Sequence, residues 1–251
     1  MHTDIELLAR WISESKRAVF FGGAGVSTES GIPDFRSVDG LYHQQYAYPP
    51  ETILSHSFFM KHQDEFYRFY RSKMLFPDAK PNAAHTALAR WEAQGHFSCI
   101  ITQNIDGLHQ LAGSKNVCEL HGSVLRNACM DCGTFYSLDD MLSKDGVPRC
   151  RCGGMIKPDV VLYEEPLDQE VMEQAIDALM SADLLIVGGM SLSVYPAAGF
   201  IDAYRGRRLA LINKSPTSRD ATASLVLRQP IGEVFAQIEA CLSGGEPFIK
   251  P

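Results

Sequence analysis

A glycine-rich segment near the start of the chain has the residue types of a phosphate-binding turn. An apolar run over residues 18–21 leads directly into 22–25, which reads Gly-Gly-Ala-Gly. Glycine allows a tight turn, and its N–H groups can face an anion at close range. A dinucleotide fingerprint, Gly-x-Gly-x-x-Gly, would need a third glycine where Thr28 stands. The segment therefore predicts a Rossmann-like start that departs from the hydride-transfer pattern, and an ordinary turn stays open as the alternative.

Four cysteines form two close pairs of the kind that bind zinc. Two residues separate Cys129 from Cys132, one separates Cys150 from Cys152, and seventeen lie between the pairs. Two pairs of thiolates on tight turns can supply the tetrahedral ligand set of Zn²⁺. Four unrelated buried cysteines would not explain this pairing. Because four protein ligands leave no open position, we expect the metal to hold the segment together rather than to perform chemistry.

Polar residues follow several apolar runs, at the points where strands are expected to end. Residues 102–109 read Thr-Gln-Asn-Ile-Asp-Gly-Leu-His after one run, and 188–193 read Gly-Gly-Met-Ser-Leu-Ser after another. His121 and the segment 213–215, Asn-Lys-Ser, follow two more. In a doubly wound sheet, residues beyond the carboxyl ends of the strands line the ligand crevice. The pattern predicts a nucleotide site, in which His121 is either a general base or a structural histidine.

The elements that must position these residues alternate between helix and strand. Apolar spacing predicts helices at 4–15, 57–75, 82–94, 168–181 and 231–242, and buried strands at 17–21, 97–101, 183–187 and 208–212. This alternation indicates an α/β fold with a Rossmann-like, doubly wound parallel sheet. The segment 122–157 breaks the pattern, because it is poor in apolar residues and rich in Cys, Gly and Asp. We expect 1–121 and 158–251 to form the Rossmann-like domain, with a helical and loop insert at about 31–80, and 122–157 to form a small structural zinc domain.

The composition is that of a globular protein. The chain has 251 residues, 45% of them hydrophobic and 21% charged, and its formal net charge of −7 disfavours nucleic acid or an anionic membrane as partner. No apolar run approaches the roughly 18–20 residues that span a bilayer, and the polar N-terminus does not resemble a secretion signal. Cysteines that cluster for metal binding point to a reducing compartment, so we expect a cytoplasmic protein. The isolated cysteines are predicted to be small buried side chains: Cys99, Cys118 and Cys241.

Taken together, these motifs resemble the sirtuin family of NAD-dependent protein deacylases, most of all its compact bacterial and archaeal members. The resemblance covers residues 5–240. Its motifs occur in the family's order, namely 23–36, 102–106, 121–122 and the four cysteines. It implies a Rossmann-like NAD-binding domain, a small zinc domain, and acyl-lysine peptide and NAD meeting between them. It also implies that NAD is a consumed co-substrate rather than a hydride carrier.

The implied reaction transfers the acyl group of acyl-lysine to ADP-ribose and releases nicotinamide, O-acyl-ADP-ribose and free lysine. His121 would be the general base that accepts a proton from the ribose diol, with Asn104 as a second catalytic residue. Phe35 would shield the reacting C1′ carbon and block the return of nicotinamide. The NAD-binding positions implied by the resemblance are Gly23, Ala24, Gly25, Thr28, Asp34, Phe35, Arg36, Gln103, Asn104, Ile105, Asp106, His121, Gly189, Ser191, Asn213 and Ile231.

Peptide binding in the family is by strand addition between the two domains. The matching positions here are Val160, Val161, Leu162, Tyr163, Ser193 and Val194. The family often has Gly-Glu after the first of these segments, whereas this chain has Glu164-Glu165. The extra carboxylate predicts either a preference for basic peptides or a solvent-facing side chain.

Two further positions depart from the family pattern. Members that prefer succinyl or malonyl groups carry Tyr-x-x-Arg, whose arginine pairs with the acyl carboxylate. Here Tyr67 is followed at that spacing by Tyr70, so we expect an uncharged acyl group, although Arg68 and Arg71 keep an acidic one open. Met190 stands where a small hydroxyl residue is usual, which predicts a changed hydrogen bond to NAD.

Two other functions stay open from the sequence. An NAD-dependent ADP-ribosyltransferase would share the nucleotide site and use a different acceptor, but His121 and the peptide segments favour deacylation. A non-enzymatic zinc module that binds nucleic acid is disfavoured by the acidic balance and by the lack of a basic run around the cysteines. The target protein, the acyl length and the oligomeric state, a monomer included, are left open.

Overall fold

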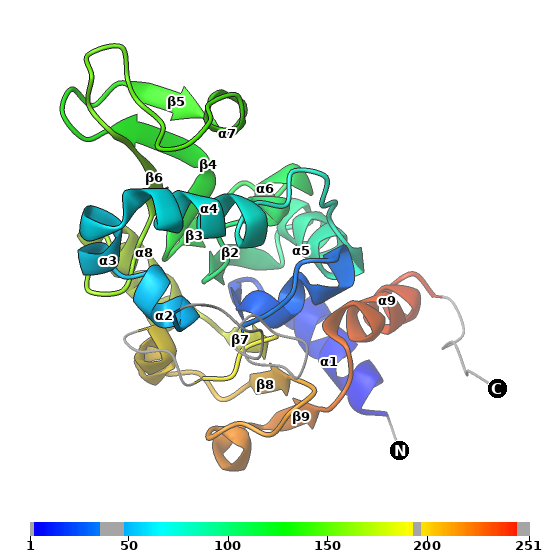
Figure 1. Ribbon diagram of the computed structural model, residues 1–251. Helices are drawn as coiled ribbons and strands as arrows, with labels where there is room; N and C mark the ends of the chain where they lie inside the picture. Colours follow the sequence, from blue (N-terminus) through cyan, green and yellow to red (C-terminus); the bar gives the residue numbers. More distant parts are fainter. Residues whose placement is uncertain (1–2, 36–47, 193–196, 245–251) are drawn as a thin grey trace.

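The computed structural model describes residues 3–35, 48–192 and 197–244, and its main feature is a parallel sheet (Figure 1). Six strands lie in the order β3-β2-β1-β7-β8-β9, and every neighbouring pair is parallel. The predicted doubly wound, Rossmann-like sheet is therefore confirmed. The strands are β1 Ala18–Gly22, β2 Phe97–Thr102, β3 Val117–Glu119, β7 Leu184–Gly188, β8 Leu209–Ile212 and β9 Leu225–Leu227.

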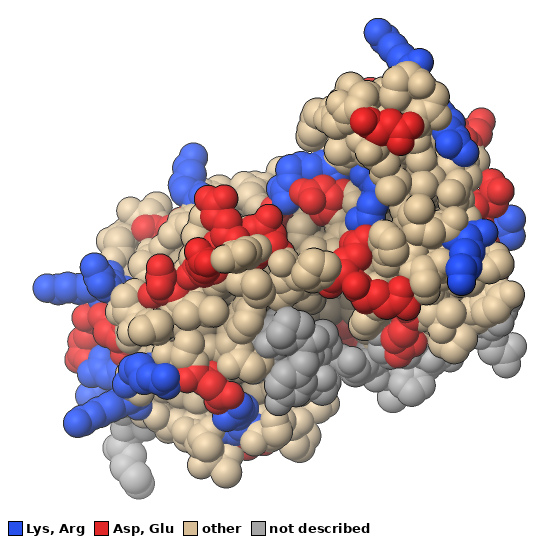
Figure 2. All heavy atoms as spheres, turned by 90° about the vertical axis from the view of Figure 1, so that its left-hand side faces the viewer, with Lys and Arg blue, Asp and Glu red and all other residues tan. Residues whose placement is uncertain are grey.

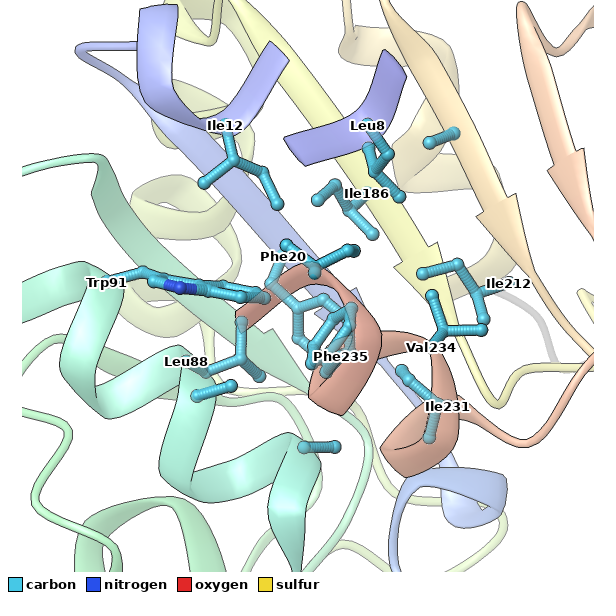
Figure 3. Close-up of a cluster of buried hydrophobic side chains, with 14 of the residues drawn as sticks. Leu8, Ile12, Phe20, Leu88, Trp91, Ile186, Ile212, Ile231, Val234 and Phe235 are labelled. Atoms are coloured by element: carbon cyan, nitrogen blue, oxygen red, sulfur yellow. The ribbon is translucent and has the colours of Figure 1, made fainter. Parts of the chain in front are cut away.

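Helices cover both faces of this sheet, which explains why its central strands are apolar throughout. Phe20 points to one face, where it packs with Leu88, Trp91 and Phe235 (Figure 3). Its neighbours on β1 point to the other face and pack with helix α8. The helices on the Phe20 face are α1 Asp4–Glu14, α5 Ala83–Ala93 and α9 Ile231–Leu242, and the opposite face carries α8 Gln169–Ser181 and a 3-10 helix, Ala197–Ala203.

A second, antiparallel sheet forms from the cysteine-containing insert. Its strand order is β5-β4-β6, with α7 alongside, and it lies at the top of Figure 1. The insert was expected to be a zinc domain, but its strands were not predicted, because the apolar alternation in each is short. The elements are β4 Gly122–Cys129, β5 Phe135–Ser137, α7 Leu138–Leu142 and β6 Ile156–Val160.

The insert and a set of short helices share one hydrophobic core. Ile156 and Met141 of the insert pack in the same cluster as Phe66 and Tyr67 of helix α4. The insert is poor in apolar residues, so it shares this core with the short helices. The helices are α2 Pro50–Ile53, α3 His56–Lys61 and α4 Gln63–Lys73.

The prediction of a single helix at 57–75 is wrong. His62 leaves the helical conformation, with φ −129° and ψ 53°, and separates α3 from α4. The bend brings Phe59 of α3 against Phe66 of α4, with ring centroids 4.8 Å apart. Burial of these aromatic rings outweighs the local preference for a continuous helix. Across the described ranges, no helix is long and apolar enough to cross a bilayer.

Candidate active site

Two glycine loops meet at the carboxyl ends of β1 and β7, where the strand order of the sheet reverses. Gly25 N donates to Gly189 O at 2.9 Å, and Gly23 N donates to Gly188 O at 3.2 Å. A Cβ on Gly25 would lie 2.8 Å from Gly189 Cα. Gly189 has φ +59°, and a Cβ there would lie 2.4 Å from Val26 N. Glycine is therefore required because the two backbones touch, and the contact fixes the switch point where ligands bind in such sheets.

A cavity of about 490 Å³ opens beside these loops, which is in the range of small-molecule and nucleotide sites. Residues after β1, β7 and β8 line it, together with the start of α9. Six of the residues predicted to bind NAD are among its lining: Gly25, Thr28, Asp34, Gly189, Asn213 and Ile231. The rest of the lining was not predicted: Glu29, Gly31, Ile32, Pro33, Ile212, Lys214, Ser215, Gln229 and Pro230.

Glu29 joins the glycine loop to the first turn of α9. Its carboxylate accepts a hydrogen bond from Gly232 N at 2.7 Å, across 203 residues of sequence. A carboxylate at a helix N-terminus is favourable because it satisfies a free N–H and faces the positive end of the helix dipole. Sequence reasoning missed Glu29, since no local signal marks a side chain that caps a distant helix.

A second polar cluster lies behind the same loop. The Ser27 hydroxyl donates to Asp106 Oδ2 at 2.6 Å and accepts from Asn104 Nδ2 at 3.0 Å. Asp106 Oδ1 accepts from Leu108 N at 2.9 Å, which orients the carboxylate. Ser27 and Asn104 are buried. The structure thus brings the predicted residues Asn104 and Asp106 together around Ser27.

Phe35 and Ile105 mark the junction between the two cores. Both are half-buried and pack against the core shared by the insert and the short helices, although each comes from a loop of the parallel sheet. Gln103 lies in the same loop as Ile105, and its Nε2 atom is buried with no hydrogen-bond partner in the described part of the chain. Its donor capacity is therefore free for a ligand.

The hydrogen bond of His121 fixes which ring nitrogen can act as a base. His121 Nδ1 lies 3.0 Å from Gln103 O. A carbonyl oxygen only accepts, so Nδ1 carries the hydrogen, and the neutral ring presents a lone pair at Nε2. Burial lowers the pKa of His121, and the bond to Gln103 only partly opposes this. The imidazole is therefore neutral near pH 7.

The predicted peptide segment runs beside His121. Val161 N donates to His121 O at 3.1 Å, and Val160 pairs with Gly122 of β4. On the other side, Tyr163 N donates to Leu54 O at 3.0 Å. The Val161 carbonyl accepts no hydrogen bond from the described residues, so one backbone acceptor of this segment is available. Three predicted residues, Arg36, Ser193 and Val194, lie outside the described residues.

The four predicted zinc ligands form one cluster. Their Sγ atoms all lie within 4.8 Å of one another, and three Sγ–Sγ separations are 3.4, 3.5 and 3.6 Å. Four sulfurs at about 2.3 Å from one zinc ion would be roughly 3.8 Å apart. Each pair sits on a tight turn whose glycine, Gly133 or Gly153, has a positive φ. The cluster therefore fits one structural zinc ion.

The departures from the family pattern have local explanations. Glu164 has φ +75°, and its carboxylate accepts from Ser57 N at 2.8 Å and Ser57 Oγ at 3.0 Å, at the start of α3. Glu165 contacts His56 and Lys157 at 2.8 and 3.1 Å. Glu164 is exposed, as the solvent-facing alternative predicts, and its carboxylate is also held by Ser57.

The departures at Met190 and in helix α4 also have local explanations. The Met190 side chain is buried in the core on the α8 face of the sheet. Tyr67 is fully buried and donates its hydroxyl hydrogen to Ile156 O. Arg71 donates to Lys144 O and Gly146 O at 2.7 and 2.6 Å, so its guanidinium is occupied by the insert.

Comparison with known proteins gives the same family at each level. The sequence profile of the Sir2 family matches residues 23–196. The NAD-dependent protein deacetylase of Clostridium perfringens is 57% identical over 242 residues, which cover 95% of this chain and 99% of the relative. A solved structure of Sir2 with a p53 peptide and NAD⁺ has a TM-score of 0.83 and 39% identity, and the match covers 96% of this chain and 98% of that one.

A second solved structure holds reaction products. It is Sir2 with the inhibitor EX-527, 2′-O-acetyl-ADP-ribose and a deacetylated p53 peptide. Its TM-score is 0.82 at 38% identity, and the match covers 95% of this chain and 98% of that one.

Proposed function

Because this chain belongs to the Sir2 family, we propose that its cavity, the Ser27 cluster and His121 form one active site for NAD and acyl-lysine. The protein is an NAD-dependent protein deacetylase, which transfers the acyl group of acyl-lysine to ADP-ribose and releases nicotinamide and free lysine. NAD is a co-substrate, and one zinc ion is structural. The expected family, the deacetylase activity, the NAD co-substrate and the structural zinc are confirmed.

The observation that carries the proposal is the orientation of His121. With Nδ1 donating to Gln103 O, the lone pair at Nε2 accepts a proton from a ribose hydroxyl, and burial keeps the ring neutral for this step. The proton transfer makes the ribose oxygen a nucleophile toward the acyl carbon. Asn104, held by Ser27, orients the ribose or a water beside it.

The two halves of NAD bind on either side of the glycine loop. The cavity takes the adenosine and diphosphate, with Thr28, Asp34, Gly189, Asn213 and Ile231 in its wall. Ser191 and Arg36 contribute to the same half. The nicotinamide half faces the Ser27 cluster, where Asp106 and Ile105 hold the carboxamide and Phe35 shields C1′. Gly23, Ala24 and Gly25 form the turn between the two halves, and Gln103 supplies its free Nε2 donor to the ribose.

Replacement of His121 tests the assignment. We expect His121→Ala to lose deacylation while it keeps its zinc and its melting temperature within a few degrees. His96→Ala is the matched control, because His96 also bonds a carbonyl through Nδ1, at 3.3 Å from Ser15 O, but lies outside the site. Turnover of His121→Ala close to that of the native enzyme would contradict the role.

The acyl-lysine peptide is proposed to bind along Val160, Val161, Leu162 and Tyr163, with Ser193 and Val194 as the second edge. The Val161 carbonyl is the acceptor that this edge offers, because Tyr163 N and Val161 N are already bonded within the chain. Strand addition of this kind gives affinity through the backbone and makes small demands on peptide sequence.

An uncharged acyl group fits the residues of helix α4 best. Tyr67 and Tyr70 are buried, and Arg71 is bonded to two carbonyl oxygens of the insert. Of the two arginines of this helix, Arg71 is therefore not available for an acyl carboxylate, and Arg68 is exposed at the surface. A panel of peptides that differ only in the acyl group, assayed with NAD, tests this. We expect acetyl to be favoured over succinyl, and the reverse order would contradict the proposal.

The charge along the peptide segment favours basic peptides. Acidic side chains form a band across the middle of the face in Figure 2. The stretch 159–177 contains no Lys or Arg and seven acidic residues: Asp159, Glu164, Glu165, Asp168, Glu170, Glu173 and Asp177. Asp159 and Glu165 are paired with cations, and the other five have no cationic partner within 4.0 Å in the described ranges.

A peptide series at two salt concentrations measures this preference. We expect peptides with Lys or Arg beside the acyl-lysine to have a lower KM than Ser-flanked ones at low salt, and the difference to shrink at high salt. Glu164→Gln should reduce the difference in KM between the two peptides. Glu173→Gln, in α8 and farther along the chain, serves as the comparison. Equal KM values for both peptides at low salt would contradict the preference.

We also propose that the protein is located in the cytoplasm, because zinc-binding thiolates require reducing conditions.

A further inference from the structure

Two buried histidines behind the Ser27 cluster have no part in the reaction as described above. His85 lies in the first turn of α5, and His109 lies in the short helix α6, Leu108–Leu111. They are 0% and 1% exposed, and their ring centroids are 4.7 Å apart at an interplanar angle of 60°. The Phe20 ring also lies near His109, with ring centroids 6.2 Å apart.

The hydrogen bonds of this pair are incomplete. His85 Nδ1 accepts from Asn82 N at 3.2 Å, so the neutral ring carries its hydrogen on Nε2. That Nε2, and both ring nitrogens of His109, are buried with no hydrogen-bond partner in the described part of the chain. An unsatisfied buried polar group costs roughly 1–3 kcal/mol. An apolar side chain in place of His109 would avoid that cost, so a purely structural role does not explain the imidazole.

Buried nitrogens without a hydrogen-bond partner are commonly satisfied by an internal water. Such a water needs two to four polar partners. Nε2 of His85 is a donor, and the ring nitrogens of His109 offer one donor and one acceptor. Because the two nitrogens of one imidazole point in different directions, a single water bonds only one nitrogen of His109, and with His85 Nε2 that gives it the minimum of two partners.

The pair is linked to two groups that shape the nicotinamide half of the site, Asn82 and Asp106. The Asn82 side chain donates to Val26 O at 2.8 Å and to Ser30 Oγ at 3.0 Å, which holds the glycine loop against α5. Asp106 is three residues before His109, and its charge acts on His85 against the effect of burial. The glycine loop held by Asn82 and the Asp106 carboxylate meet at Ser27, which lies in that loop and donates a hydrogen bond to Asp106.

We propose that His85 and His109 are positioning residues, which hold Asp106 and the glycine loop in register for nicotinamide through an internal water that bridges His85 Nε2 and one ring nitrogen of His109. The inference rests on the proposed function, because it assumes that the Ser27 cluster binds the nicotinamide half of NAD. It assigns the histidines no contact with substrate. Their effect reaches the reaction only through Asn82 and Asp106.

The decisive variant is His109→Leu, which removes both unpartnered nitrogens and keeps the position apolar. We expect a tenfold or larger fall in kcat/KM for NAD, both in deacetylation and in exchange of free nicotinamide into NAD. The KM for the acetyl-lysine peptide should stay within twofold, and the melting temperature should be unchanged or higher. His109→Gln, which restores a donor and an acceptor, should recover activity to within about threefold of the native enzyme.

Two results would overturn the proposal. One is a His109→Leu protein that folds and keeps its kcat/KM for NAD within twofold of the native value. The other is a fall in peptide and NAD parameters alike that His109→Gln does not rescue, because that pattern indicates a loss of packing. Leu111→Ala is the control on the same helix, since Leu111 is exposed and should change neither parameter.

A measurement on the native protein keeps the test independent of folding. With ¹⁵N-labelled histidine, the ring signals of His85 and His109 should shift when nicotinamide or NAD is added and stay in place when only acetyl-lysine peptide is added. Absence of a nicotinamide-dependent shift would also overturn the proposal. The proposed function is tested separately, because its failure would appear as native protein that does not release nicotinamide from NAD.

Discussion

The direction of one hydrogen bond determines the chemistry that His121 can perform. Donation from Nδ1 to Gln103 O leaves Nε2 as the only basic atom of the ring. The types of the site residues were predictable from the sequence, because glycines, amides and a histidine follow the expected strands. The tautomer was not, because it depends on a carbonyl 18 residues away that only the folded sheet brings into contact.

The pH dependence of deacylation follows from this burial. Burial lowers the pKa of His121 from its ordinary value of 6.5, so the neutral, basic form persists as pH falls through 6.5. We expect the acid limb of single-turnover product formation to have its midpoint below 6.5. Nicotinamide exchange, measured in parallel, should not share this limb, because the base acts after nicotinamide leaves. A common midpoint at or above 6.5 would contradict the argument.

Glu164 combines a strained backbone with a useful side chain. Its positive φ costs about 1 kcal/mol for a residue other than glycine, while its carboxylate caps α3 through Ser57, which contributes about 1 kcal/mol. We expect Glu164→Ala to reduce the free energy of unfolding by about 1 kcal/mol, because the strain remains and the cap is lost. Glu164→Gly should be close to neutral. Urea denaturation of both variants measures the difference, and equal losses would show that the conformation carries no cost.

At the scale of elements, the insert and helix α4 are parts of one core. The sequence predicted the zinc ligands from their spacing, but placed the 57–75 helix with the large domain, because linear order says nothing about which core an apolar face enters. In the structure Tyr67 of α4 donates a hydrogen bond to Ile156 O of β6, and Arg71 donates to two carbonyl oxygens in the loop before β6. The aromatic residues of α3 and α4 meet there because the chain bends at His62.

Removal of zinc should therefore affect more than the insert. We expect chelation, or Cys150→Ser, to raise hydrogen exchange in β4, β5 and β6 and also in α4, and to abolish deacylation. His121 directly precedes β4, and Val160 ends β6, so both lose their support. Exchange in β1 and β7 should stay low. Unchanged protection of α4 in the zinc-free protein would show that the two parts are independent.

At the scale of the whole molecule, buried histidines tie stability to pH. Burial lowers the pKa of His85 to about 4 and that of His109 to about 3, with Asp106 opposing the effect at His85. In the unfolded chain both groups titrate near 6.5, so between these values the unfolded state binds more protons. The fold loses no stability from these groups above pH 6.5, and loses it progressively as pH falls below 6.5, toward 4 for His85 and toward 3 for His109.

Melting curves of the native protein and His109→Leu at pH 7.5 and pH 5 test this linkage. We expect the melting temperature of the native protein to fall more between the two pH values than that of the variant, which lacks one of the two groups. Carboxylates contribute equally to both proteins and cancel in the comparison. An identical fall would show that His109 does not contribute to acid sensitivity.

The shared core has a practical consequence for protein engineering. The portable unit of this fold is not the stretch between the first and last zinc ligand, because most residues of the core that it packs in lie outside that stretch. A chimaera that exchanges substrate-binding parts with another family member should carry residues 50–75 together with 122–162. These two segments are one cassette in three dimensions, although 46 positions of sequence, residues 76–121, stand between them.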